Sequence, residues 1–214
     1  MSVTDLAVLT GASEMTIRRD LEVLAAQGVL ERYRGGARSL LLRGVEPPFA
    51  LRASDDVDAK RRIAHAVAGL IADGESVVLD SGTTCVEVAH VLHDRRLTVM
   101  PLSLHAVNTL TDAPSMTLLI PGGAPRPGEL ALTGPLTEAS LAALRFDTAV
   151  IGCCGLTVTH GVTGYDLADA SKFARTALAV VAPVTDLAVV VTDTAAPPTE
   201  IAALEAAGVV VHQA

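Results

Sequence analysis

The chain has 214 residues, half of them apolar, so it can bury a core in one large domain or in two smaller ones. No run of about eighteen apolar residues lacks a charge or a helix breaker, and no basic-then-apolar leader follows Met1, so we expect a cytoplasmic protein without a membrane segment. The net charge of −8 is uneven, because residues 1–43 carry six basic and five acidic side chains and the acidic excess lies in the rest of the chain. An acidic body is compatible with DNA binding where a local face is basic.

The first predicted elements are two helices that meet at a turn. A short helix over residues 5–9 ends at Gly11, and a second helix begins after Ser13, as in a helix-turn-helix. At about 100° per residue, the second helix places its apolar side chains on one stripe and turns a mostly charged set away from it. The stripe comprises Ile17, Leu21 and Leu24, and the opposite set comprises Met15, Arg18, Arg19 and Glu22.

A two-stranded wing is predicted after these helices. Residues 28–38 show a short apolar and polar alternation interrupted by Gly35-Gly36, which is typical of a hairpin. The wing would carry Arg32, Arg34 and Arg38 beside a phosphate backbone. On the second helix alone, an alternative is a solvated surface helix in which Glu14, Arg18 and Glu22 form ion pairs at i,i+4 spacing.

The motif SEMTIRRDL and the GG-A wing resemble the amino-terminal winged helix-turn-helix of the DeoR family of bacterial repressors. The resemblance implies operator DNA as a partner. The DNA-contacting residues it implies are Ser13, Met15, Thr16, Arg18, Arg19, Arg34 and Arg38. Family members usually have a further helix before the one at Asp5, so we expect residues 1–45 alone not to fold cooperatively.

Residues 39–48 lose periodicity and contain Gly44, Pro47 and Pro48, which predicts a linker and two domains, 1–45 and 46–214. In the second domain a helix over 59–71 carries Ile63, Val67, Leu70 and Ile71 on one stripe. Strand-like and helix-like segments then alternate along the chain. This order predicts a mostly parallel α/β sheet covered on both faces.

Three predicted strands end in small polar or glycine turns. These turns are Asp80-Ser81-Gly82-Thr83-Thr84, Gly122-Gly123, and Gly152 to Gly155. Because ligands of open α/β sheets bind at the carboxyl ends of strands, the three turns should line one crevice. The first turn leads into a helix and offers backbone N–H groups and hydroxyls that suit a phosphate, although such residues also make ordinary turns and caps.

The segments VLDSGTT, PGG, FDTAVIGCCGL and DASKF resemble landmarks of the DeoR-family sensor domain, whose fold is similar to that of ribose-5-phosphate isomerase. The resemblance implies a phosphorylated sugar or related metabolite as the effector. Its implied contacts are Asp80, Ser81, Gly82, Thr83, Thr84, Ser103, Gly122, Gly123, Gly152, Gly155, Asp169 and Lys172. No Trp is present to stack on a sugar ring, so recognition must depend on hydrogen bonds and the phosphate.

Two departures from the family pattern affect this site. The family often has Thr-Asn-Ser where this chain has Pro101-Leu102-Ser103. Between Leu167 and Ala168 the family has roughly twenty more residues, comprising a helix and a strand. Asp169 and Lys172 follow that junction, so their place in the crevice depends on how the shortened chain folds.

The sequence therefore predicts a DNA-binding transcriptional regulator, a repressor, acting as a dimer or a higher even oligomer because helix-turn-helix operators are commonly two-fold. The alternative is a sugar-phosphate isomerase on the same fold, with a general base among Asp80, Asp166, Asp169 and Lys172. We expect no catalytic residue, cofactor or metal in the regulator. Cys85, Cys153 and Cys154 are expected to be small core residues.

Overall fold

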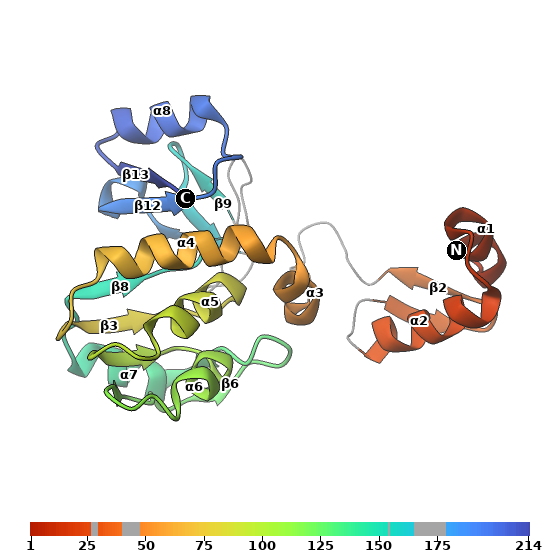
Figure 1. Cartoon of the computed structure of the whole chain (residues 1–214), viewed down its shortest axis with the longest axis horizontal. Coiled ribbons are helices and arrows are strands. Elements are labelled where there is room, and N and C mark those ends of the chain that lie inside the picture. Colours follow the sequence, from red (N-terminus) through yellow and green to blue (C-terminus); the bar gives the residue numbers. More distant parts are fainter. Residues whose placement is uncertain (27–29, 40–47, 154, 165–178) are drawn as a thin grey trace. The chain divides into compact units, whose positions relative to one another are not determined.

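The computed structural model describes residues 1–26, 30–39, 48–153, 155–164 and 179–214. The chain divides into two units, Met1–Arg52 and Ala53–Ala214, each with its own internal contacts. Figure 1 shows the first unit in red to orange and the second from light orange through yellow and green to blue. Among the helices of these described residues, none is long and apolar enough to cross a membrane.

The first unit begins with helix α1, Val3–Thr10. It starts earlier than the predicted residues 5–9, because the Ser2 hydroxyl accepts the Asp5 N–H at 3.0 Å and the Asp5 carboxylate accepts the Ser2 N–H at 3.1 Å. This reciprocal capping satisfies donors that the helix end leaves free. Gly11 ends α1 with φ 69°, a left-handed conformation that favours glycine.

Helix α2, Glu14–Ala26, follows a short turn and confirms the predicted stripe in part. Ile17 and Leu21 are buried at 7% and 6% exposure, and Leu24 is half-buried. Ser13 accepts the Thr16 N–H at 3.2 Å, so its side chain occupies the first turn of the helix. The two helices therefore form the predicted helix-turn-helix.

The wing is an antiparallel pair of strands, β1 (Leu30–Tyr33) and β2 (Gly36–Ser39), as predicted. Its turn contains Gly35 at φ 95°. The start of the chain pairs with the wing, since the Met1 amino group donates to Ala37 O at 2.9 Å and Ser2 bridges Gly36. The buried core of this unit is small and comprises Val3, Ile17, Leu21 and Ala37.

After the wing, helices and strands alternate along most of the chain. They are α3 (Phe49–Ser54), α4 (Val57–Leu70), β3 (Ser76–Leu79), α5 (Thr83–Leu92), β4 (Thr98–Pro101), α6 (Leu104–Leu110), β5 (Thr117–Leu118), β6 (Ala124–Pro125), β7 (Leu132–Thr133), α7 (Pro135–Ala143), β8 (Thr148–Val150), β9 (Gly155–Thr157), β10 (Gly161–Gly164), β11 (Ala179–Ala182), the 3₁₀ turn η1 (Val184–Asp186), β12 (Val189–Thr192), α8 (Pro198–Ala206) and β13 (Val210–Gln213).

The predicted parallel sheet is present, with strand order β5-β4-β3-β8. Its strands carry buried aliphatic side chains such as Val77, Leu79 and Val99, each with no exposed surface. Helices α4 and α5 pack side by side along the sheet, and α5 contacts α6 (Figure 1). The main core of the second unit lies between these helices and the sheet.

The predicted stripe of α4 is wrong at one position. Leu70 is 46% exposed, whereas Ala64, Ala68 and Ile71 are buried. Ile71 follows the last helical residue in an extended conformation, so its side chain does not follow the helical repeat. The two alanines form the buried side of α4 where α5 packs, because small side chains let the helices approach.

Three smaller sheets were not predicted. Strands β9, β10 and β11 form an antiparallel sheet, β12 and β13 form a parallel pair, and β6 and β7 form a hairpin. A second apolar cluster, with Leu156, Val162 and Leu204 among its buried members, lies under the first two of these sheets and α8. The second unit therefore has two cores.

Candidate functional site

The exposed side of α2 carries the residues that the sequence assigns to DNA. Met15 is 81% exposed, and Arg18 and Arg19 are also exposed. Ser13 and Thr16 lie in the first turn, where their hydroxyl oxygens are 2.9 Å apart. An exposed recognition helix with polar groups at its amino end matches the part of a helix-turn-helix that enters a major groove.

Two ion pairs hold arginines near this surface. Arg18 Nη2 donates to Glu14 Oε2 at 3.1 Å within α2, and Arg32 Nη1 on the wing donates to Glu22 Oε1 at 2.8 Å. Glu14 also accepts a hydrogen bond from Thr4 Oγ1 at 2.7 Å, so it joins α1 to α2. The ion pairs of the alternative surface-helix interpretation are therefore partly present, beside an intact helix-turn-helix.

The wing presents Arg34 at its turn, where the residue is exposed. Arg38 lies in β2 opposite Glu31, and its side chain is outside the described part of the chain. The wing therefore keeps a basic residue at the turn predicted to lie beside a phosphate backbone.

The first candidate effector positions lie at one edge of the parallel sheet. Leu79 on β3 pairs with Pro101 on β4 and with Val150 on β8. Two residues further along each segment come Ser81, Ser103 and Gly152. The parallel register therefore brings these three positions to the carboxyl edge of the sheet.

Asp80 fastens the turn after β3 to the end of β8. Its Oδ1 accepts the Ser81 N–H at 2.8 Å and its Oδ2 accepts the Gly152 N–H at 3.2 Å. A Cβ added to Gly152 would lie 3.1 Å from Ser81 O and 3.5 Å from Cys85 Sγ. The carboxylate and the glycine together set a close approach of the two chain segments.

The turn 81–83 forms the amino end of α5. Gly82 precedes the helix at φ 104°, in the left-handed region that favours glycine. Ser81 is 1% exposed, and its Oγ has no hydrogen-bond partner among the described residues. Thr83 is buried and Thr84 is half-buried. A buried hydroxyl without a partner at a helix amino end can supply a hydrogen bond to an anionic ligand.

Ser103 lies two residues after the end of β4. It is 1% exposed, and its Oγ accepts the Ala106 N–H at 3.2 Å, so it caps α6. Its backbone forms a bridge with Ala131 before β7. Ser103 therefore also holds the β6–β7 hairpin against the end of β4.

Gly122 and Gly123 are explained in the structure by packing on α7. A Cβ added to Gly122 would lie 2.9 Å from Leu136 Cβ. Gly123 has φ 126°, and a Cβ added there would lie 2.6 Å from Thr133 O and closer still to Thr137 Oγ1. Thr137 Oγ1 donates to Gly122 O at 2.5 Å. The two glycines follow β5 at the carboxyl edge, where close helix packing requires them.

The remaining candidate effector residues do not all belong to the parallel sheet. Gly155 lies in β9, where its carbonyl accepts a hydrogen bond from Thr163 Oγ1 at 3.1 Å, so it belongs to the antiparallel sheet rather than to the parallel one. Asp169 and Lys172 lie outside the described residues. Among the described residues no group of three or more His, Cys, Asp or Glu side chains has the arrangement of a metal site.

Sequence reasoning missed three ionisable residues beside Ser103. Glu129, 7% exposed, and half-buried Arg126 lie in the β6–β7 hairpin, whose Leu130 O accepts the Leu104 N–H at 2.9 Å. His105 follows Leu104, and its burial lowers its pKa, while the charge of Glu129 acts in the opposite direction. The segment Arg126-Pro127-Gly128 has the composition of a turn, and nothing in it marks burial.

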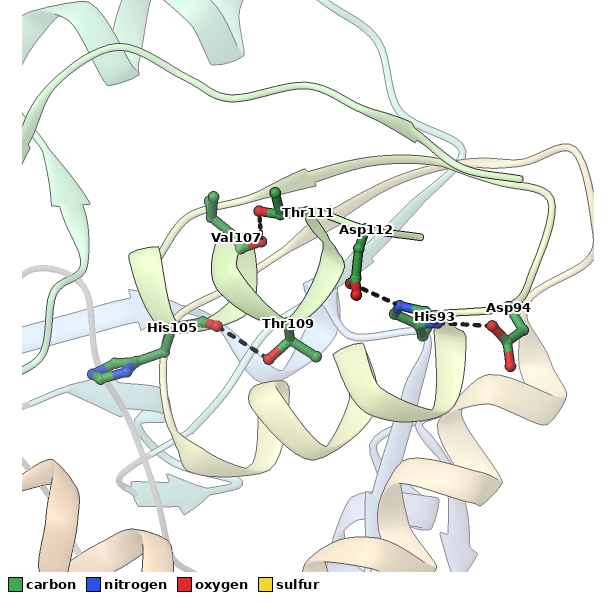
Figure 2. A network of polar contacts seen from close by, with 7 residues as sticks. All are labelled: His93, Asp94, His105, Val107, Thr109, Thr111 and Asp112. Carbon is green, nitrogen blue, oxygen red and sulfur yellow. Dashed lines mark hydrogen bonds and ion pairs between the residues drawn. The ribbon is translucent and has the colours of Figure 1, made fainter. Parts of the chain in front are cut away.

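A second histidine lies near the other end of α6. Figure 2 shows His93 between two carboxylates, with Nδ1 2.7 Å from Asp94 Oδ1 and Nε2 3.1 Å from Asp112 Oδ1. These hydrogen bonds, with the Asp94 bond the stronger influence, raise the pKa of His93. The network joins the end of α5 to the segment after α6.

Two family models match the chain. The DeoR-like helix-turn-helix domain matches residues 1–41, and the DeoR C terminal sensor domain matches residues 55–168. The second match alone spans more than half of the chain. The two matches agree with the two units of the structure.

Curated relatives match most of the chain as well. The transcriptional repressor AccR of Agrobacterium fabrum is 33% identical over 202 residues, covering 85% of this chain and 78% of its own length. The glycerol-3-phosphate regulon repressor of Escherichia coli is 29% identical and covers 92% of this chain and 85% of its own length.

The uncharacterized regulator YulB of Bacillus subtilis is 29% identical over 222 residues, covering 95% of this chain and 86% of its own length. The aligned length exceeds the 214 residues of this chain, so the relative has residues without a counterpart here. The shortening predicted between Leu167 and Ala168 would leave such residues of the relative unmatched, and its position stays a prediction.

Proposed function

The chain belongs to the DeoR family of DNA-binding transcriptional regulators, and we propose that it represses an operon of sugar metabolism until a phosphorylated sugar or related metabolite binds its second unit. The observation that carries the effector part is the buried Ser81 hydroxyl, which has no partner in the described part of the chain and lies at the amino end of α5. The DNA part rests on α2 and the wing.

On DNA, α2 enters the major groove and the wing lies along the backbone. Arg18 and Arg19 are exposed and lie off the buried stripe of Ile17 and Leu21. Ser13, Met15 and Thr16 at the amino end of α2 also contact the duplex, while Arg34 and Arg38 contact phosphates. Charged side chains on an exposed helix supply both base contacts and sequence-independent affinity.

The effector binds at the carboxyl edge of the parallel sheet. Backbone N–H groups at the start of α5 attract its phosphate, and Gly82 lets the ligand approach the main chain. Ser81, Thr83 and Thr84 supply hydroxyls, and Asp80 contributes by holding the turn. The proposed contacts are completed by Ser103, Gly122, Gly123 and Gly152, together with Asp169 and Lys172; Gly155, which lies in the antiparallel sheet, is left out. The relative named glycerol-3-phosphate regulon repressor supports a small phosphorylated polyol or sugar as the ligand class.

The protein acts as a homo-oligomer of even number in the cytoplasm. Two copies of the helix-turn-helix match a two-fold operator, whose half-sites lie about one helical turn of DNA apart or a multiple of it. Size measurement in solution, with and without DNA, tests this part.

The arrangement favours a regulator over an isomerase. An isomerase requires a general base that reaches the substrate. Asp80, the candidate within the described residues, uses its two carboxylate oxygens to hold the N–H groups of Ser81 and Gly152. The relatives' names also identify transcriptional regulators.

A thermal-shift screen of phosphorylated sugars and polyols, each beside its unphosphorylated form, tests the effector. A specific ligand stabilises the native state by RT ln(1 + [L]/Kd), which is about 2.7 kcal/mol when [L] is 100 times Kd. A true effector must also change operator affinity, typically by about 1–3 kcal/mol, and DNA must change effector affinity by the same factor.

Gly82→Val should block the ligand by crowding, and Thr83→Ala should weaken it, while both variants keep DNA binding in the absence of ligand. The proposal fails if no phosphorylated compound raises the melting temperature. Turnover of such a compound, abolished in Asp80→Asn, would favour the isomerase instead.

A further inference from the structure

Two adjacent arginines on α2 have different surroundings. The guanidinium of Arg18 is held by Glu14 one turn earlier, at 3.1 Å, although its side chain remains 59% exposed. Arg19 is also exposed, and within the described residues no ion pair holds it. The sequence alone makes the two residues look equivalent.

Glu14 is in turn held from the other helix. Thr4 Oγ1 on α1 donates to Glu14 Oε1 at 2.7 Å, and Arg18 uses the second carboxylate oxygen. The hydrogen bond from Thr4, followed by that from Arg18, lowers the pKa of Glu14. The carboxylate is therefore charged at neutral pH, and its direction is fixed by two helices.

Stability does not account for this arrangement. An exposed i,i+4 ion pair contributes only about 0.3–0.5 kcal/mol. Its geometric effect is larger, because it directs the Arg18 guanidinium back toward the amino end of α2. The amino end of a recognition helix is the part that meets base edges in the major groove.

We propose that the Thr4–Glu14 contact makes Arg18 the base-reading arginine and leaves Arg19 to contact a phosphate. This inference rests on the proposed DNA-binding function. Reading guanine through N7 and O6 requires a guanidinium in a fixed orientation, since both hydrogen bonds form in one plane. A phosphate accepts hydrogen bonds from many directions, which suits Arg19, since no ion pair holds it among the residues that the structure describes.

Glu14 has a second effect on discrimination. A carboxylate close to the duplex repels phosphates on every sequence, so it weakens non-specific binding. On a site with guanine at the right position, the oriented Arg18 offsets that repulsion. Glu14 is therefore a positioning residue that increases the ratio of specific to non-specific affinity.

The test is selection of bound sequences from a randomised duplex DNA library, using the full chain and its variants. Glu14→Gln removes the charge and leaves one acceptor oxygen for the two donors, Thr4 and Arg18, and Thr4→Val removes the contact from α1. Neither variant changes Arg18 itself. Glu22→Gln is the matched control, because it removes the same charge from the same helix and releases Arg32 on the wing instead. Circular dichroism checks that each variant keeps its helices.

We expect Glu14→Gln and Arg18→Ala to flatten the preference at the same base pair. For Glu14→Gln, discrimination there should fall about three- to tenfold, less than the loss of a whole bidentate contact. Arg19→Ala should weaken binding to all sequences alike. It should also reduce the slope of the logarithm of the binding constant against the logarithm of the salt concentration by about one. Glu22→Gln should alter affinity for all sequences together and keep the base preference.

Three outcomes would overturn the inference. The first is selection of the wild-type sequence by Glu14→Gln with equal sharpness, and the second is loss of a base preference in Arg19→Ala rather than in Arg18→Ala. Either result refutes the assignment and leaves the DNA-binding function standing. If the folded wild-type chain enriches no sequence at all, the proposed function fails together with the inference.

Discussion

Asp80 Oδ2 accepts the backbone N–H of Gly152 at 3.2 Å, so one carboxylate ties the turn after β3 to the end of β8. The same approach crowds a side chain on Gly152, whose added Cβ would lie 3.1 Å from Ser81 O. The geometry of the proposed effector turn therefore depends on a residue 71 positions away from Ser81 in the chain.

Gly152→Ala should lower the free energy of unfolding by about 1–3 kcal/mol, because the added methyl group overpacks a close contact. It should also weaken effector binding by displacing Ser81. Urea unfolding and calorimetric titration measure the two effects. Gly69→Ala is the control. Gly69 lies in α4, and a Cβ added there would have nothing within 4 Å, so alanine should stabilise the chain by about 0.5–1 kcal/mol and leave the effector bound. Equal effects of both substitutions would contradict the packing argument.

Ser81→Ala should separate binding from stability. The Ser81 Oγ is buried without a partner among the described residues, so its removal should leave the free chain as stable as wild type or stabilise it by about 1 kcal/mol. Effector affinity should fall about tenfold, since the ligand loses a hydrogen bond worth about 1.4 kcal/mol. Chemical unfolding without ligand and titration with ligand give the two quantities.

Ser76→Ala provides the matched control at the opposite end of β3. Its hydroxyl donates to Asp147 Oδ2 at 2.7 Å, so its removal should destabilise the chain by about 1 kcal/mol and spare effector binding. A loss of stability in Ser81→Ala equal to that in Ser76→Ala would show that the Ser81 hydroxyl has a structural partner.

The sequence predicted those parts of the structure that depend on local patterns. Burial of Ile17 and Leu21 follows from helical spacing, and the parallel strands over residues 76–79 and 98–101 follow from apolar runs between helices. The row of turns at the carboxyl edge follows from the parallel order. Each of these features is encoded within about ten consecutive residues.

Features that depend on distant contacts escaped prediction. Gly155 looks like the end of a strand in the parallel sheet, yet it pairs with Thr163 in an antiparallel sheet. Strands β6 and β7 have two residues each, too few to show a periodicity, and the Ser103 bridge to Ala131 fixes where their hairpin lies. The burial of Glu129 follows from that placement.

The pH dependence of stability should contain a contribution from His93. Its pKa is raised in the folded chain from the ordinary value of 6.5, by Asp94 first and then by Asp112. The folded state therefore binds the proton more tightly, so the contribution is full below pH 6.5 and is lost as pH rises through the higher folded pKa. The pKa of Asp112 is lowered chiefly by the hydrogen bond from His93. The contribution of Asp112 to the free energy of unfolding is therefore lost as pH falls through its folded pKa.

His93→Gln should consequently remove part of the fall in melting temperature between about pH 6 and pH 8. Thermal melts at closely spaced pH values measure the difference. Parallel profiles for wild type and His93→Gln across this range would contradict the expected effect of the two carboxylates.

Arg126 should contribute to recognition of an anionic effector, although no sequence pattern singles it out. The backbone N–H of Arg126 donates to Ala131 O at 2.7 Å, and Ala131 forms a β-bridge with Ser103. Arg126 therefore belongs to the carboxyl edge where the phosphate is proposed to bind. A guanidinium there supplies positive charge within a unit that is acidic as a whole. Such a charge-assisted hydrogen bond is worth about 1.5–3 kcal/mol, which corresponds to roughly a ten- to hundredfold change in affinity.

Arg126→Ala should therefore lower affinity for a phosphorylated sugar found in the screen and reduce its advantage over the unphosphorylated sugar. Arg126→Lys should recover part of the advantage, because lysine keeps the charge and loses the planar fork. Arg145→Ala is the control, since Arg145 Nη1 donates to Leu144 O at 2.9 Å just after α7 and should affect neither ligand. If Arg126→Ala weakens both ligands by the same factor, the arginine supports the hairpin and does not read the phosphate; a phosphate-specific loss assigns it to the effector site.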